Sequence, residues 1–207
     1  MGIKKKLGLG LASAALGLSL VGGGTFAYFN DVETSNNTFA AGTLNLTLNP
    51  TQMFKIQNMK PGDKMFKRFN LKNDGSLNIK NVLLQTDYTV HDANNNNGTS
   101  DFADDIEVTF LEYEGAWPGN PPLDQWDDLQ GVKVVSKMTL KQLSELDPAD
   151  LSTVANLLPQ GSLAPNKDVY LTVQLEFKDK GNQNQFQGDS LDLDWTFTAN
   201  QEAGTWK

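Results

Sequence analysis

Apolar and polar residues alternate along much of the chain, with the period of a β-strand that buries one face and exposes the other. The alternation is strongest in three segments, 44–48, 169–177 and 191–197. Weaker strand patterns occupy the segments 66–71, 77–90, 106–113 and 132–135. Because antiparallel sheets commonly expose one face to water, the pattern predicts an all-β fold of antiparallel strands packed as a β-sandwich.

Turn and helix signals separate these strands. Pro and Gly within Lys60–Asp63 predict a tight turn, and Asn73–Ser76 is typical of a hairpin turn. The segments 139–146 and 148–158 carry leucines at helical spacing, so we expect two short helices there. Short helices among many strands favour a sandwich that contains a helical insertion.

The N-terminal residues 1–27 have the order of features found in a secretory signal peptide. Lys4–Lys6 form a positive head, an apolar run follows over 7–21, and small residues precede Tyr28. The apolar run has about 15 residues, fewer than the roughly 20 needed to span a bilayer. We therefore expect a signal peptidase to cut between Ala27 and Tyr28, and the protein to be secreted. An uncleaved membrane anchor is the alternative.

The charge and the cysteine content of the chain argue against several classes of function. The formal net charge is −8, and loss of the three signal lysines makes the mature chain more acidic still. An acidic chain is a poor match for nucleic acid, because phosphate binding needs clustered Lys and Arg. The chain has no cysteine, which excludes disulfides and thiol chemistry. We place the β-sandwich domain at 43–199, a separate N-terminal segment at 28–42 and a flexible tail at 200–207.

Carboxylates cluster after a low-complexity loop. The segment Asp92–Ser100 reads DANNNNGTS and predicts an exposed loop. Asp101, Asp104 and Asp105 follow it, and oxygen-rich loops of this kind can hold calcium. A solvated acidic loop is the alternative to a metal site. A second acidic loop, which we interpret as a surface excursion, contains Trp117, Asp124, Trp126, Asp127 and Asp128.

Enzyme chemistry has little support in the sequence. His91 is the single histidine, so the chain lacks the paired histidines of the common zinc proteases. It also lacks a nucleophile-elbow motif, a P-loop and a dinucleotide-binding glycine pattern. The remaining carboxylate ligands suit calcium better than catalytic zinc.

The first residues of the mature chain allow two arrangements. An extended apolar segment either pairs within its own sheet or completes the open sheet edge of a neighbouring subunit. A head-to-tail contact of the second kind makes filaments if it does not close into a ring. The donated strand would consist of Tyr28, Phe29, Asn30, Asp31 and Val32.

Several runs resemble the TasA/camelysin family of Gram-positive spore formers. The quoted runs are KKKLGLGLASAALGLSLVGGGTFAYFND, NNTFAAGTLNLTL, the KPGD turn, LKNDGSLNIKNV and FQGDSLDLDWTFTANQ. The resemblance covers nearly the whole chain and does not distinguish the TasA members of the family from the CalY members. It implies a jelly-roll β-sandwich, cleavage at Ala27–Tyr28, and secretion to the cell surface and biofilm matrix. It also implies homopolymeric fibres whose subunits donate an N-terminal strand to the next subunit.

The same resemblance leaves other functions open. The family carries the name of a cell-surface metallo-endopeptidase, which would need calcium or zinc, and no catalytic motif of the family transfers to named positions here. An adhesin or accessory subunit that works with a paralogous fibre protein is a third interpretation. For the fibre itself, the complete set of strand and turn signals favours stacked folded domains over a cross-β amyloid.

Overall fold

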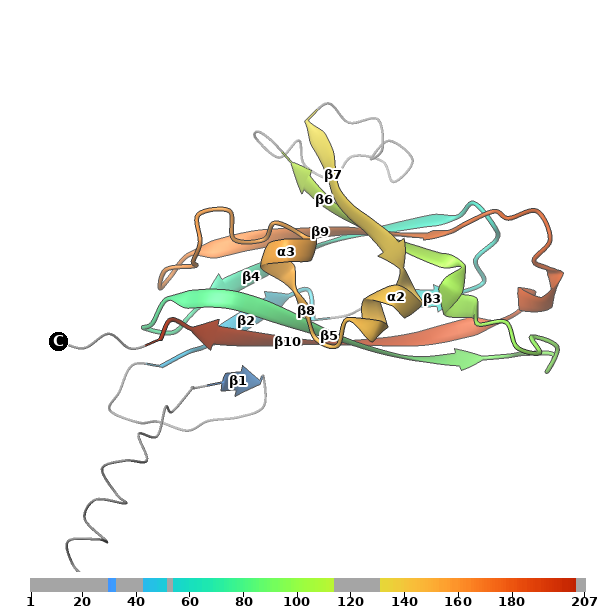
Figure 1. The fold of residues 1–207 in the computed structure, drawn as a ribbon, viewed down its shortest axis with the longest axis horizontal. Coiled ribbons are helices and arrows are strands. Elements are labelled where there is room, and N and C mark those ends of the chain that lie inside the picture. Colours follow the sequence, from blue (N-terminus) through green and yellow to red (C-terminus); the bar gives the residue numbers. More distant parts are fainter. Residues whose placement is uncertain (1–29, 33–42, 52–53, 114–130, 204–207) are drawn as a thin grey trace, which may run out of the picture.

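The computed structural model describes residues 30–32, 43–51, 54–113 and 131–203. Within these ranges the strands form two antiparallel sheets that face each other (Figure 1). One sheet contains β1 (Asn30–Val32), β3 (Lys55–Gln57), β5 (Ile79–His91), β8 (Ala149–Asp150) and β10 (Ser190–Gln201). The other contains β2 (Leu46–Asn49), β4 (Lys64–Asn73), β6 (Ile106–Tyr113), β7 (Val132–Thr139) and β9 (Asp168–Phe177). The prediction of an all-β antiparallel sandwich is confirmed.

The strands change sheet at almost every step along the chain. From β2 to β6, and again from β7 to β10, each strand lies in the sheet opposite to the strand before it. In the described part of the chain, β6 and β7 are the consecutive strands that pair directly with each other. Long connections between two facing sheets are typical of the jelly-roll architecture.

The hairpin predicted at Asn73–Ser76 is wrong, because β4 and β5 belong to different sheets. The cause is the side chain of Asn73, which is fully buried instead of exposed at a turn. Its Nδ2 donates hydrogen bonds to the carbonyl oxygens of Leu77 at 2.8 Å and Leu163 at 2.9 Å. Its Oδ1 accepts from the backbone N–H of Gly75 at 3.0 Å. These bonds fix a crossover between the sheets.

The turn predicted at Lys60–Asp63 is confirmed. The backbone N–H of Asp63 donates to the carbonyl oxygen of Lys60 at 2.9 Å. The carboxylate of Asp63 in turn accepts from the backbone N–H of Lys60 at 2.7 Å. This turn carries the chain from β3 in one sheet to β4 in the other.

The helices are short, and α2 and α3 lie near β7 and β8 (Figure 1). They are η1 (Phe102–Asp104), α2 (Leu140–Glu145), α3 (Leu151–Val154) and η3 (Asn184–Phe186). Thr139 caps α2 by accepting from Gln142 N at 3.1 Å, and Gln142 Oε1 accepts from Thr139 N at 2.9 Å. No helix in the described ranges has the length and apolar character needed to cross a membrane.

The second predicted helix, 148–158, is much shorter than expected. Ala149 and Asp150 instead form the strand β8, which pairs with Leu84 and Leu83 of β5. Asp150 then caps α3 by accepting from Ser152 N at 2.8 Å. The helix ends before Asn156, whose φ of 49° lies in the left-handed region.

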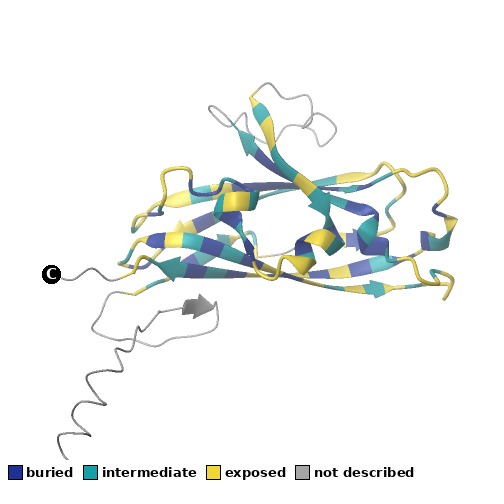
Figure 2. Cartoon of the chain, viewed as in Figure 1, coloured by how far each residue is buried: buried dark blue, intermediate teal, exposed yellow. Residues whose placement is uncertain are grey.

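The core fills the space between the two sheets, and buried and exposed residues alternate along β5 and β10 (Figure 2). Leu191, Leu193, Trp195 and Phe197 of β10 are all buried, as their alternation predicts. The strand β10 continues to Gln201, so the last two strand residues extend into the segment expected to be the tail.

Candidate functional site

One edge of β10 is only partly covered by neighbouring strands. On one side, β5 pairs along the whole length of β10. On the opposite side, β3 pairs with Ser190–Asp192 and β1 pairs with Thr198–Asn200. Among the described residues, no strand pairs with Leu193–Phe197 on that side. In the part of the chain that the structure describes, the middle of β10 is therefore a short backbone edge between the ends that β3 and β1 occupy.

The strand β1 is part of the segment predicted to be donated. Asn30 pairs with Asn200, Asp31 with Ala199 and Val32 with Thr198, in antiparallel register and within the same chain. The backbone thus has the first of the two arrangements that the sequence allowed for this segment. Ala27, Tyr28 and Phe29 lie outside the described residues.

An aromatic cluster lies behind the partly covered edge. The ring centroid of Trp195 is 5.9 Å from that of Phe54 and 6.0 Å from that of Phe69. The rings of Phe69 and Phe197 are 6.3 Å apart. The indole Nε1 of Trp195 is buried and has no hydrogen-bond partner among the described residues. All four rings are buried, so the stretch Leu193–Phe197 contributes the side chains of Trp195 and Phe197 to an aromatic part of the core.

A hollow opens where β3 meets β10. It has a volume of about 400 Å³ and is lined by residues 54–57 and 190–194. The hollow thus adjoins the first residues of the uncovered stretch of β10. This position allows a side chain of an added strand to enter the hollow.

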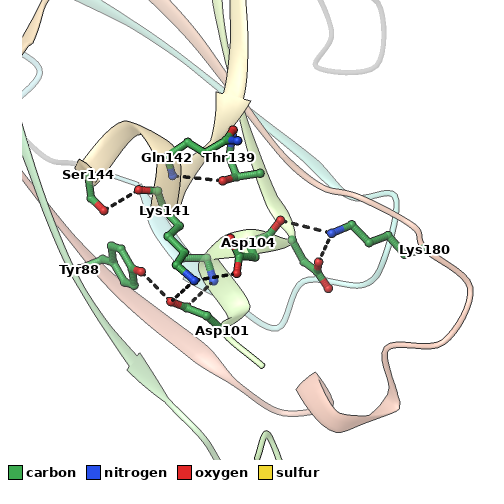
Figure 3. Close-up of polar contacts among 10 residues, drawn as sticks. Tyr88, Asp101, Asp104, Thr139, Lys141, Gln142, Ser144 and Lys180 are labelled. Atoms are coloured by element: carbon green, nitrogen blue, oxygen red, sulfur yellow. Dashed lines mark hydrogen bonds and ion pairs between the residues drawn. The ribbon is translucent and has the colours of Figure 1, made fainter. Parts of the chain in front are cut away.

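The carboxylates predicted to bind metal form part of a polar cluster at η1 (Figure 3). Asp101 accepts hydrogen bonds from the hydroxyl of Tyr88 at 2.7 Å and from the backbone N–H of Ala103 at 3.0 Å. Asp104 forms an ion pair with Lys141, with 3.0 Å between Oδ2 and Nζ. Burial raises the pKa of the Tyr88 hydroxyl, and its bond to Asp101 raises it further. The Asp104 hydrogen bond raises the pKa of Lys141.

Asp105 is more deeply buried and has different partners. Its carboxylate forms an ion pair with Lys180 and accepts a hydrogen bond of 2.7 Å from Nε2 of Gln183. The three carboxylates therefore contact protein donors from β5, α2 and the β9–β10 connection. No three His, Asp or Glu side chains of the described residues are grouped as a metal site requires. A metal ion at these positions stays a prediction.

The sequence identified these carboxylates but not their partners. Tyr88 is 13 positions from Asp101, whereas Lys141 is 37 positions from Asp104 and Gln183 is 78 positions from Asp105. Their approach depends on which strands become neighbours in the fold. The acidic side chains of the second loop, Asp124, Asp127 and Asp128, lie outside the described residues.

The single histidine is paired with a carboxylate. Nε2 of His91 lies 2.7 Å from Oδ2 of Asp192, and both side chains are more than half exposed. A catalytic zinc site usually needs three protein ligands and an open position. In the part of the chain that is described, His91 and Asp192 have no third ligand beside them. Among the described residues, His91 and Asp192 thus supply two of the ligands that such a zinc centre needs.

Comparison with known proteins places the chain in a family. It is 38% identical to the protein named major biofilm matrix component from Bacillus subtilis (strain 168). The match covers 99% of this chain and 90% of that protein. The profile of the camelysin metallo-endopeptidase family matches residues 2–206. This chain therefore belongs to the camelysin family.

Proposed function

We propose that this chain is a secreted structural subunit of an extracellular biofilm matrix. In this proposal each subunit donates its N-terminal strand to the β10 edge of the next subunit, which produces a head-to-tail homopolymer. The main support is the stretch Leu193–Phe197, which no strand in the described part of the chain pairs with on the side of β3, and which adds Trp195 and Phe197 to the aromatic cluster. A relative named as a biofilm matrix component supports the structural role.

Exchange of β1 between copies needs no new kind of contact. The pairs that join β1 to its own β10 can form equally between β1 of one copy and β10 of another. The intrachain pairing involves three residues of each strand. Continued in this register, a donated segment would place Phe29 and Tyr28 opposite Gln201 and Glu202, and the residues after Val32 opposite Leu193–Phe197.

Order-of-magnitude energies are consistent with this exchange. Each additional ladder hydrogen bond contributes about 0.5–1.5 kcal/mol. A buried side chain such as Phe29 contributes about 1.5–3 kcal/mol. Ordering the backbone costs about 1–2 kcal/mol per residue. Side chains that enter the hollow or cover the aromatic cluster therefore decide whether the added strand binds.

Export supplies the place and the timing of assembly. The sequence predicts that a signal peptidase cuts between Ala27 and Tyr28, which frees the segment to be donated. Assembly then takes place at the cell surface and in the extracellular matrix. A paralogous fibre subunit with a similar edge is a second partner that the same geometry allows.

Engineered cysteines test the path of the donated strand directly. The chain has no cysteine of its own, so any disulfide must come from the introduced residues. Asn30→Cys is made in one batch of mature protein and Asn200→Cys in another, because these positions are register partners. The batches are mixed under assembly conditions and oxidised. Donation between copies predicts a disulfide-linked pair of chains, visible on a non-reducing gel.

A matched control uses the other end of the same strand. Mixing Asn30→Cys with Ser190→Cys should give little cross-linking, since Ser190 lies opposite β3. Equal cross-linking in both mixtures would mean that the chains collide without register. Filaments without any Asn30–Asn200 cross-link would contradict donation of this strand.

Truncation tests whether the segment is needed. Mature protein that lacks residues 28–37 should fold but not form filaments in electron micrographs. A synthetic peptide of residues 28–37 should bind the truncated protein at the β10 edge without producing filaments. Filaments of the truncated protein as abundant as those of the mature protein would show that assembly uses other contacts.

The name of the family suggests peptidase activity as a second candidate function. The sequence contains one histidine and no cysteine, and His91 has no metal-site neighbours among the described residues. We therefore propose a structural rather than a hydrolytic role. Cleavage of a casein-like substrate by purified protein, abolished by a chelator and absent from a mock preparation, would contradict this.

A further inference from the structure

The loop over Asp92–Ser100 is ordered by two carboxylates. Asp92 accepts hydrogen bonds from the backbone N–H groups of Asn94 and Asn96, each at 3.2 Å, and of Asn97 at 3.0 Å. Asp189, which is 4% exposed, fastens the loop to the start of β10. A run of asparagines that predicts an open loop is therefore folded back onto the body of the domain.

Asn97 is the side chain through which Asp189 holds the loop. Nδ2 of Asn97 donates to Oδ2 of Asp189 at 2.7 Å, and Oδ1 of Asp189 accepts from Ala93 N at 2.9 Å. Oδ1 of Asn97 is buried and has no hydrogen-bond partner among the described residues. The amide nitrogen of Asn97 is thus the part of this side chain that the contact requires.

Asn97 is followed by Gly98, and this pair has a specific reactivity. The backbone nitrogen of Gly98 can attack Cγ of Asn97, closing a succinimide ring and expelling Nδ2 as ammonia. Water then opens the ring at either carbonyl and leaves aspartate or isoaspartate. A side chain on the following residue hinders the attack, but glycine has none. The space around the Cβ position of Gly98 is also open, with no atom within 4 Å.

We propose that Asn97 is a spontaneous deamidation site that Asp189 restrains, and that its conversion to an acid releases the loop. The restraint follows from the geometry, because Cγ of Asn97 must turn toward Gly98 while Nδ2 is held by Asp189. The backbone N–H of Asn97 is held as well, by Asp92. The folded loop therefore slows a reaction that its sequence favours.

Release follows from charge. After deamidation an oxygen replaces the nitrogen that donated to Asp189, so a new carboxylate at the partly buried Asn97 faces the buried carboxylate of Asp189. Like charges in a site with little access to water repel strongly. The hydrogen bond from Asn97 to Asp189 is lost at the same time, which leaves the bonds of Ala93 to Asp189 and of Asn94 to Gln187 at the start of the loop. An extracellular chain would thus undergo an irreversible change with age.

The restraint is tested by ageing the purified chain at mildly alkaline pH and mapping its peptides by mass spectrometry. We expect Asp189→Ala to deamidate at Asn97 several-fold faster than the wild type. Asp179→Ala, a matched carboxylate on the same β9–β10 connection, should behave like the wild type. Asn95 and Asn96, which precede asparagine, serve as internal controls. An unchanged rate in Asp189→Ala would overturn the restraint.

Two further measurements keep the proposal testable if Asp189→Ala does not fold. Wild-type protein in urea should deamidate at Asn97 faster than the folded protein, and equal rates would overturn the restraint. Asn97→Asp should accelerate amide hydrogen exchange over residues 92–100. Asn95→Asp, which adds the same charge at an exposed position of the loop, should not. If the amides of residues 92–100 exchange as slowly in Asn97→Asp as in the wild type, the proposal that deamidation releases the loop is wrong.

Discussion

Asp105 and Gln183 are 78 positions apart in the sequence, yet their side chains form a buried hydrogen bond of 2.7 Å. Asp105 is 7% exposed and Gln183 is 8% exposed. In Asp105→Ala the amide of Gln183 loses this partner inside the protein, so we expect a loss of about 1–3 kcal/mol in the free energy of unfolding. Urea denaturation measures it. Asp104→Ala, at a more exposed carboxylate, should cost less, and equal losses would contradict the role of burial.

Protein cations compete with any metal ion for the carboxylates near η1. Lys141 binds Asp104, and Lys180 binds Asp105. Replacing both lysines by methionine frees these carboxylates, so we expect the double variant to bind calcium more tightly than the wild type. Isothermal titration calorimetry compares the two proteins. If neither protein binds calcium, the metal site predicted at Asp101, Asp104 and Asp105 is wrong.

The loop held by Asp92 should lose its stability in acid. The backbone N–H of Asn97, supported by those of neighbouring residues, lowers the pKa of Asp92 below its usual value of 3.8. A group whose pKa is lowered by folding stabilises the folded state above its unfolded pKa. That stabilisation is lost as the pH falls below 3.8 and through the lower folded value. Asp92→Asn should therefore be less stable than the wild type near neutral pH.

The prediction is checked by measuring how the difference in hydrogen exchange between wild type and Asp92→Asn depends on pH. Hydrogen exchange of the 92–100 amides in wild type and Asp92→Asn should differ at neutral pH and converge as Asp92 becomes protonated. A difference that stays constant down to the lowest pH would mean that charge is not its cause.

Gly75 lies against the backbone that leads into β2. A Cβ atom at this position would lie 2.3 Å from the carbonyl oxygen of Thr43 and 2.8 Å from the backbone N of Asn45. Because backbone atoms cannot turn aside like a flexible side chain, we expect Gly75→Ala to cost about 1–3 kcal/mol. Thermal unfolding measures it. Gly161→Ala meets no atom within 4 Å, so only its φ of 87° opposes the substitution. An equal cost in both would contradict the steric explanation.

Cleavage before Tyr28 should control assembly. Precursor that retains residues 1–27 keeps the N-terminal strand joined to an apolar segment, so we expect the purified precursor to stay monomeric. Analytical ultracentrifugation before and after treatment with signal peptidase measures the change. Filaments formed by intact precursor would contradict this control.

The sequence predicted the long strands well because their alternation is regular. The core residues of β10, such as Leu193 and Trp195, follow directly from that period. The strands β3 and β8 were not predicted, because three and two residues are too few to show a period. The burial of the Asn73 side chain was not predicted, for another reason. An asparagine before Asp and Gly is typical of an exposed turn, and its burial depends on the carbonyl oxygen of the distant Leu163.

Part of the candidate site was also accessible from sequence. The N-terminal segment 28–32 was recognised as an extended strand from its position and its apolar residues, but its register on β10 was not. That register depends on which strands pair with β10, and β5 and β3 come from separate parts of the chain. The carboxylates at η1 were named individually, while the lysines that neutralise them arrive from α2 and the β9–β10 connection.

The position of β10 in its sheet has a consequence for the order of folding. His91 pairs with Ser190, and β5 therefore waits for a partner that is synthesised about a hundred residues later. The strands β1 and β3 wait for the same partner. Until β10 has been synthesised, the sheet that contains β1, β3 and β5 lacks the strand that joins them. The aromatic core residues Phe54 and Phe69 then lack their contacts with Trp195 and remain exposed. Nascent chains should consequently depend on protection against aggregation until their C-terminal residues are free.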